Sequence, residues 1–287
     1  MESLLLIDFS WLYNKYYFVA KYNNSLEPTR DLSPTVLRML EEFLSLVERS
    51  YARTKMKVLL ALDSPTSSLK NFELCSEYKQ NRDKEGKKEV YKGLNYILAE
   101  LVKYLNPKTF AFVKSKNYEA DQIIAYFVYK YYKEKEITIF SGDKDLLQLT
   151  WYKNVYISDK FKNGKFVIKS DEEIFEKFKN NKGESFTRIS ENKRDILKYR
   201  TLRGDTSDNL SSVFPRIKDK EIIEIIQNYW IDECFLTESG IDDILYDMKQ
   251  HNPILAKKLE VNKDIWLRNF KIMNLFDIEN LKIVRIK

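Results

Sequence analysis

Five short apolar runs within the first 160 residues constrain the fold more than any other feature of this 287-residue chain. Each run is almost continuously hydrophobic, as expected for strands of a sheet that is covered on both faces. Segments with helical periodicity lie between them, among them residues 118–132 and residues 33–53, where Pro34 suits a first helical turn. The predicted strands are residues 3–8, 57–63, 109–113, 137–141 and 154–158.

This alternation predicts an α/β fold, with a mostly parallel, twisted sheet and helices on both faces. The pattern changes after about residue 170, where four helical segments and one strand candidate at 281–286 follow. We therefore predict a sheet domain over residues 1–180 and a helical region over residues 181–287. The four helical segments are residues 171–180, 191–205, 219–230 and 261–276.

Composition narrows the class of protein. A hydrophobic content of 44% favours a folded chain, and 49 Lys and Arg against 43 Asp and Glu fit a nucleic-acid partner without requiring one. Cys75 and Cys234 match no zinc spacing, and the single histidine, His251, argues against histidine metal sites and Ser-His-Asp catalysis. With no signal peptide or membrane-length apolar run, we predict a cytoplasmic protein that has no membrane partner.

Acidic residues stand where the predicted strands end. Each of them alone could serve a turn or a helix N-terminus. Together they would crowd one rim of a parallel sheet and would need a counter-ion. Because the ligands are oxygens only, the rim predicts Mg²⁺, with Mn²⁺ as a substitute, and two such ions about 3.5–4 Å apart would indicate a nuclease. These acids are Asp8, Asp63, Glu119, Asp121, Asp143 and Asp145.

Five motifs carry a resemblance to a known family. In chain order they read LLLIDFS, EYKQNR, NYEAD, SGDKDLLQL and RGDTSDN. This set resembles the 5′→3′ exonucleases and flap endonucleases, over residues 4 to about 275, and the phage replication ribonuclease H-type branch most of all. The resemblance implies a PIN-like 5′-nuclease core, a helical arch over about residues 80–118, and a divergent helix–three-turn–helix element in the region 181–287.

The resemblance also implies two groups of metal ligands. The family pattern G-D-x-x-D-N matches Gly204 to Asn209, and one helical turn would carry Asp205 and Asp208 towards the rim. Gln122 departs from the family, whose phage and bacterial members usually have an aspartate there, so we expect altered metal affinity rather than loss of activity. The implied ligands are Asp8, Asp63, Glu119, Asp121 and Asp143 for a first ion, and Asp145, Asp205 and Asp208 for a second.

Three residues match the family's Y-K-x-N-R phrase. Lys79 and Arg82 would face the scissile phosphate, where fixed cations stabilise developing charge. Tyr78 would stack on a terminal base. The alternative for this stretch is a solvated, charged loop, which we expect for the lysines that follow it.

The segment after Asn209 lacks the family's glycines. Ser212, Pro215 and Ile217 stand in the places of a glycine-rich hairpin that binds duplex backbone and often K⁺. Fewer glycines offer fewer positive-φ positions, which puts the K⁺ site in doubt. We predict instead that charge holds the phosphates, through Arg216, Lys218 and Lys220.

These observations predict a monomeric, divalent-metal-dependent 5′ nuclease of replication, in the host cytoplasm if phage-encoded. Its substrates would be DNA with 5′ flaps, nicks or free 5′ ends, and RNA–DNA hybrids. A single-strand-binding protein or a sliding clamp stays open as a partner. One alternative is a non-catalytic junction-binding protein. Another is a PIN-type ribonuclease, which would share the first four acids but would not explain residues 205–208.

Overall fold

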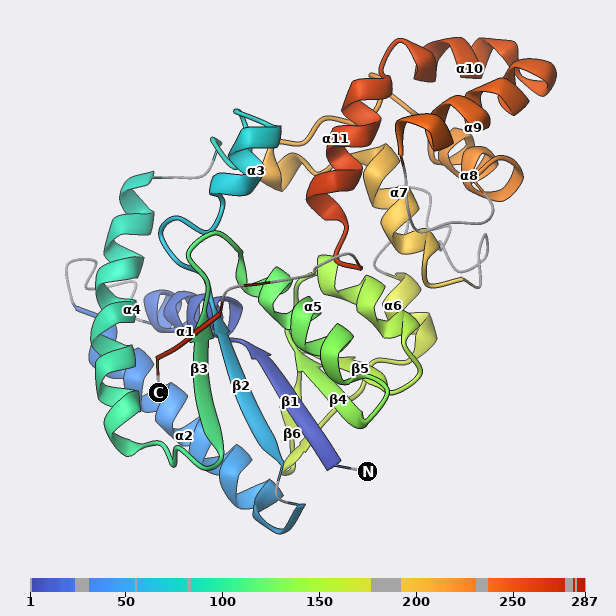
Figure 1. The fold of residues 1–287 in the computed structure, drawn as a ribbon. Coiled ribbons are helices and arrows are strands. Elements are labelled where there is room, and N and C mark those ends of the chain that lie inside the picture. The colour runs from blue at the N-terminus through green and yellow to red at the C-terminus, as the bar shows by residue number, and fades with distance from the viewer. Residues whose placement is uncertain are drawn as a thin grey trace.

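The sheet has the predicted parallel character. In this computed structural model, which describes residues 2–23, 31–54, 56–81, 84–176, 192–230, 237–276, 281 and 283–286, the main sheet runs β5-β4-β1-β2-β3-β8 (Figure 1). The first five strands are parallel, and β8 pairs with β3 in the antiparallel direction. The strands are β1 (Glu2–Asp8), β2 (Lys57–Leu62), β3 (Phe110–Lys114), β4 (Lys135–Phe140), β5 (Val155–Ser158) and β8 (Val284–Arg285).

The central strand β1 shows why these runs are almost continuously apolar. It lies between β4 and β2, and its residues 4–7 are all buried. Because side chains alternate along a strand, Leu5 and Ile7 enter the core on one face and Leu4 and Leu6 enter the core on the other. A sheet buried on both faces has no solvated side and therefore no polar alternation.

The first face is covered by α1 (Phe9–Asn23), α2 (Ser33–Tyr51) and α4 (Lys84–Tyr104). Helix α1 directly follows β1 and is an element that the sequence patterns did not single out. From Leu94 onwards α4 packs into the core, and β3 belongs to the sheet. The predicted arch over residues 80–118 is therefore too long, because an arch has to stand clear of the core.

The second face is covered by α5 (Ala120–Tyr131) and by the 3₁₀ helix η2 (Asp145–Trp151), and the helical region packs against η2 through α7. The same hydrophobic core continues from the sheet into that region, where Trp266 is fully buried. The sheet and the C-terminal helices therefore share one core. The remaining helices are α3 (Leu69–Leu74), α6 (Asp171–Glu176), α7 (Asp195–Arg203), α8 (Asp219–Asn228), α9 (Glu238–His251), α10 (Pro253–Glu260) and α11 (Lys263–Met273).

The fold class is confirmed, whereas several boundaries differ from the prediction. The helix predicted over 191–205 begins at Asp195 and ends at Arg203, because Gly204 takes a φ of 73°. A Cβ at Gly204 would lie 2.5 Å from the Leu210 carbonyl oxygen, so only glycine fits this turn. The predicted domain boundary at residue 180 lies outside the described residues. Across the described ranges, the helices are all too short or too polar to cross a membrane.

Candidate active site

The carboxyl ends of three neighbouring parallel strands meet at one cavity of about 190 Å³. Asp8 is the last residue of β1, Asp63 follows β2, and Asp143 lies beyond β4. Helix α5 and the segment after α7 bring further acids to the same cavity. All eight predicted ligands line it: Asp8, Asp63, Glu119, Asp121, Asp143, Asp145, Asp205 and Asp208.

Two of the strand-end acids are held by hydrogen bonds from their surroundings. The Asp8 carboxylate accepts from the Trp11 backbone N–H and from Ser141 Oγ, both at 2.9 Å. The Asp63 carboxylate accepts from the Ala120 N–H at 2.8 Å. Burial, helped by the charge of Asp63, nevertheless raises the pKa of Asp8 to about 7. Burial and Glu119 also raise the pKa of Asp63. These carboxylates therefore lack sufficient positive charge around them.

Lys79 places a positive charge against this group. Its Nζ lies 2.7 and 2.8 Å from the two Glu119 carboxylate oxygens and 3.6 Å from Asp208 Oδ2. Although burial opposes ionisation of Glu119, the Lys79 ammonium lowers the pKa of that carboxyl. Lys79 thus joins an acid of the predicted first ligand group to an acid of the second.

Tyr78 is not placed as predicted. Its side chain is buried, and its hydroxyl donates to Glu119 Oε2 at 2.9 Å and to Asp208 Oδ2 at 3.2 Å. Base stacking requires an exposed ring face, so that role is wrong for this conformation. The ring instead packs edge-on against Phe72 and orients two carboxylates through its hydroxyl.

Gln122, the departure from the family motif, caps helix α5. Its side-chain oxygen accepts from the Glu119 backbone N–H at 3.0 Å, and the residue is buried. Gln122 does not line the carboxylate cavity, whereas its neighbour Asp121 does. Burial, followed by the charge of Glu119, raises the pKa of Asp121 well above its usual range. A neutral amide at position 122 therefore supports the helix start without adding a further charge beside Asp121.

Asp205 and Asp208 reach the cavity by a route other than the predicted helical turn. Helix α7 has already ended, and Asp205 instead caps the 3₁₀ helix η4 (Thr206–Asp208) by accepting from the Ser207 N–H at 2.8 Å. Asp205 and Leu210 exchange backbone hydrogen bonds of 2.9 and 2.8 Å, which close the loop. The correction follows from Gly204, whose conformation cannot continue an α-helix.

Arg200 is the principal site residue that the sequence patterns missed. Its guanidinium lies 2.6 Å from Asp145 Oδ1 and 2.7 Å from Asp205 Oδ2. Burial opposes its charge, yet these two carboxylates raise the pKa of Arg200. The sequence did hold a signal for Arg200. The apolar residues Ile196 and Leu202 place this face of α7 in the core, and an arginine buried beside them needs an acidic partner.

The remaining predicted residues lie elsewhere. Arg82 falls outside the described residues. Arg216, Lys218 and Lys220 are exposed and do not line the carboxylate cavity. Asn209 takes a φ of 59° and Arg216 a φ of 60° in the segment between α7 and α8, so two positive-φ positions exist there without a glycine, against the expectation from composition.

The donor set suits a hard divalent cation, because it consists of carboxylates that are largely removed from solvent and short of positive charge. In the conformation described here, over the residues that the structure covers, no three Asp, Glu, His or Cys side chains converge closely enough to hold an ion. Lys79 and Arg200 instead bind several of these acids. The chemistry of the site fits a metal, and binding would require the carboxylates to rearrange around it.

Comparison with known proteins agrees with the geometry. Residues 3–179 match the family model described as 5′–3′ exonuclease, N-terminal resolvase-like domain. The 5′–3′ exonuclease of Mycoplasmopsis pulmonis is 25% identical over 92% of this chain and 82% of its own length. That of Buchnera aphidicola is 29% identical over 79% of this chain and 67% of its own.

Solved structures share the fold. The bacteriophage T5 5′-exonuclease with bound zinc ions covers 96% of this chain and 90% of its own, at 18% identity and a TM-score of 0.61. The T5 flap endonuclease in a pseudo-enzyme-product complex with DNA and metal ions covers 96% and 89%, at 18% identity and a TM-score of 0.60. The family model covers most of the chain, and the chain belongs to the 5′–3′ exonuclease family.

Proposed function

We propose that this chain is a divalent-metal-dependent nuclease that removes 5′ flaps and digests DNA from nicks and free 5′ ends, and that it also cuts RNA–DNA hybrids. The observation that carries the proposal is the convergence of eight carboxylates and Lys79 on one cavity. A binding protein would have no use for so many acids facing a polyanion, since they repel phosphate unless cations lie between.

The first carboxylate group and the second would each hold one ion, Mg²⁺ or Mn²⁺. Bound divalent cations would supply Lewis-acid stabilisation of the phosphate oxygens and would ease deprotonation of the attacking water. Lys79 would then leave Glu119 for the scissile phosphate, where an ammonium stabilises developing charge. Tyr78 and Ser68, which donate to Glu119, would keep that carboxylate oriented.

The proposal is tested with a 5′-labelled flap, a nicked duplex and an RNA–DNA hybrid, each incubated with Mg²⁺, Mn²⁺ or EDTA. We expect cleavage only with a divalent cation, and 5′-phosphate and 3′-hydroxyl ends. Undiminished cutting in excess EDTA would rule out the metal-dependent mechanism. The relative rates on the three substrates would rank DNA against RNA and exonuclease against endonuclease action.

One observation favours a second candidate, a junction-binding protein without activity. Lys79 and Arg200 already bind acids of both groups, and the described carboxylates do not converge on an ion. Such a protein would bind flap DNA equally well with EDTA and with Mg²⁺ and would cut none of the three substrates. Calorimetric titration with Mn²⁺ separates the candidates, because a pure binding protein would show no saturable site in this cavity.

A further inference from the structure

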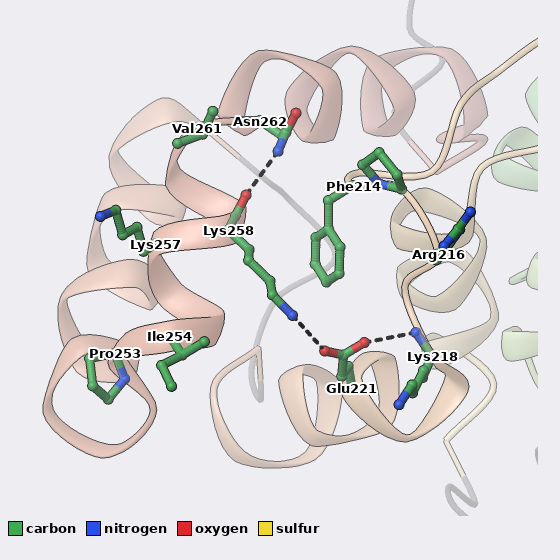
Figure 2. Close-up of a pocket in the computed structure, with 11 residues that line it drawn as sticks. Phe214, Arg216, Lys218, Glu221, Pro253, Ile254, Lys257, Lys258, Val261 and Asn262 are labelled. Carbon is green, nitrogen blue, oxygen red and sulfur yellow. Dashed lines mark hydrogen bonds and ion pairs between the residues drawn. The ribbon is translucent and has the colours of Figure 1, made fainter.

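A second concave surface shares no lining residue with the carboxylate cavity. Helix α10 and the segment 214–218 flank a groove of about 920 Å³, which we call the α10 groove. Figure 2 shows Pro253, Ile254 and Lys257 on one side of it and Phe214 and Arg216 on the other. In Figure 1, α8, α9 and α10 lie together, beyond α7 and α11 as seen from the sheet.

The α10 groove is mainly apolar, and part of its apolar lining is open to solvent. Ile254 is 74% exposed and Val261 is 79% exposed. Phe214 forms a buried part of the wall, with Lys258 Nζ 5.3 Å from its ring centroid. Exposed aliphatic side chains that border a hollow of this size are typical of a site that takes up another apolar group.

Basic side chains surround this apolar lining. Arg216, Lys218, Lys257 and Lys258 line the groove, and Glu221 is the acid among its lining residues. Glu221 is already engaged, since its carboxylate accepts from the Lys218 backbone N–H at 2.8 Å and lies 3.2 Å from Lys258 Nζ (Figure 2). Within the described residues, neither Arg216 nor Lys257 has an ion-pair partner. The groove therefore presents uncompensated positive charge beside apolar surface.

We propose that the α10 groove binds an acidic peptide segment of a partner protein, one that inserts one or two apolar side chains between flanking carboxylates. The apolar side chains would pack on Ile254 and Val261, and the carboxylates would pair with Arg216 and Lys257. This combination gives affinity from apolar burial and selectivity from charge complementarity.

Other occupants match the groove less well. Duplex DNA would pair with the basic residues, but a phosphate backbone offers nothing to cover Ile254 and Val261. A second copy of this chain has a net charge of +6, which is a poor complement to a basic groove. An anionic membrane would need apolar side chains that project outwards, whereas these border a hollow.

The test starts with a random-peptide display selection on the full chain, followed by a subtraction step on an Ile254→Ser/Val261→Ser variant. Both residues are highly exposed, so the variant should fold normally. We expect enriched peptides that combine acidic residues with leucine, isoleucine or phenylalanine. Recovery of no such sequence, or of sequences that the variant retains equally, would overturn the proposal.

Fluorescence anisotropy with one enriched peptide then measures each contribution. Ile254→Ser should weaken binding about tenfold, because one aliphatic contact is lost. Lys257→Gln should weaken it by a smaller factor that shrinks at high salt. Tyr246→Ser and Lys271→Gln, at exposed positions outside the groove, serve as matched controls and should leave the peptide affinity unchanged.

A duplex-DNA arm separates the two classes of partner. Ile254→Ser should leave the affinity for duplex DNA unchanged. Loss of duplex affinity by Ile254→Ser with an unchanged peptide affinity would assign the groove to nucleic acid and overturn the proposal. Because the readout is binding, the result does not depend on nuclease activity.

Discussion

The two carboxylate groups in the cavity are balanced by different means. The first group, Asp8, Asp63, Glu119, Asp121 and Asp143, sits at the ends of rigid strands and at the start of α5, and Lys79 contacts it at Glu119. The second group, Asp145, Asp205 and Asp208, lies on 3₁₀ turns. Arg200 forms ion pairs with Asp145 and Asp205 of this group. The sheet positions most of the first group, whereas ion pairs with Arg200 hold two of the three acids of the second.

The pKa shifts follow this difference. Burial and neighbouring acids raise the pKa of Asp8, Asp63 and Asp121 in the first group. In the second group burial opposes ionisation of Asp205, yet Ser207 and Arg200 lower its pKa. The charge of Arg200 does not fully offset the burial of Asp145, because the pKa of Asp145 is still raised to about 7. The first group therefore has the larger unmet need for a cation.

The largest expected effect is the loss of a first-group ligand. Asp143→Ala and Asp8→Asn should each slow flap cleavage about a thousandfold or more, because several kcal/mol of cation-mediated stabilisation disappear. Binding of flap DNA should stay unchanged or tighten, since repulsion of phosphate falls. Single-turnover rates and gel-shift affinities measure both, with the exposed acid change Asp243→Ala as control. Parallel loss of binding and rate would indicate a structural role instead.

Removal of Arg200, the cation that pairs with the second carboxylate group, should have the next largest effect. Arg200→Met leaves Asp145 and Asp205 without their partner and should lower the free energy of unfolding by about 3–5 kcal/mol in EDTA. Added Mn²⁺ should restore more stability to this variant than to the wild type, because a cation then replaces the guanidinium. Urea unfolding checks this, and Arg203→Met, at a half-exposed side chain of the same helix, is the control. Equal Mn²⁺ responses would show that no cation takes the place of the guanidinium.

Lys79→Ala should reduce the maximal single-turnover rate about a hundredfold while changing substrate affinity little, because a cation at the scissile phosphate acts most as charge builds. Lys79→Arg should recover part of that rate. A variant with poorer affinity and an unchanged maximal rate would make Lys79 an ordinary backbone contact. Lys79 pairs with Glu119 of the first carboxylate group and with Asp208 of the second. The rate of the Lys79 variants therefore measures most directly how far the two carboxylate groups act together in cleavage.

The free energy of unfolding should depend on pH, because buried carboxylates in both groups lack enough positive charge around them. In the folded state, burial raises the pKa of Asp8 and of Asp145 to about 7, far above an unfolded value of about 3.9. Their contribution to stability is fully present below about pH 4 and is lost as pH rises through about 7. In EDTA the free energy of unfolding should therefore fall by on the order of 1–4 kcal/mol between about pH 5 and about pH 8. Urea unfolding across this range measures it. Asp8→Asn should flatten the decline, and a stability that rose with pH would contradict it.

The smallest effect concerns the basic segment beyond the second group. Neutralising Arg216, Lys218 and Lys220 should weaken binding to flaps with a downstream duplex, and each lost phosphate contact should flatten the log–log salt slope by about 0.9. Short single-stranded substrates should be cut as before. Exchange of K⁺ for Na⁺ should matter little. A strong K⁺ preference would show that the segment around Arg216, with its positive φ, binds the ion without the family's glycines.

The sequence alone determined the sheet and the rim. Strands buried on both faces must be nearly continuous in apolar residues, and parallel strands bring their carboxyl ends to one edge. Asp8, Asp63 and Asp143 could therefore be assigned to one site from their positions in the chain, because strand period and direction are local properties. The five motifs added the family, which the match over residues 3–179 confirms.

Only the tertiary structure decided how the charges are partnered. Arg200 and Asp145 are far apart in the chain, and Tyr78 meets Glu119 across 41 residues, so no local pattern could pair them. Turn geometry decided how Asp205 reaches the cavity, because Gly204 ends α7 one residue before Asp205. Ion pairs and burial depend on which surfaces meet after folding. The sequence could place the carboxylates at one rim, but it could not show that two cations, Lys79 and Arg200, already lie among them.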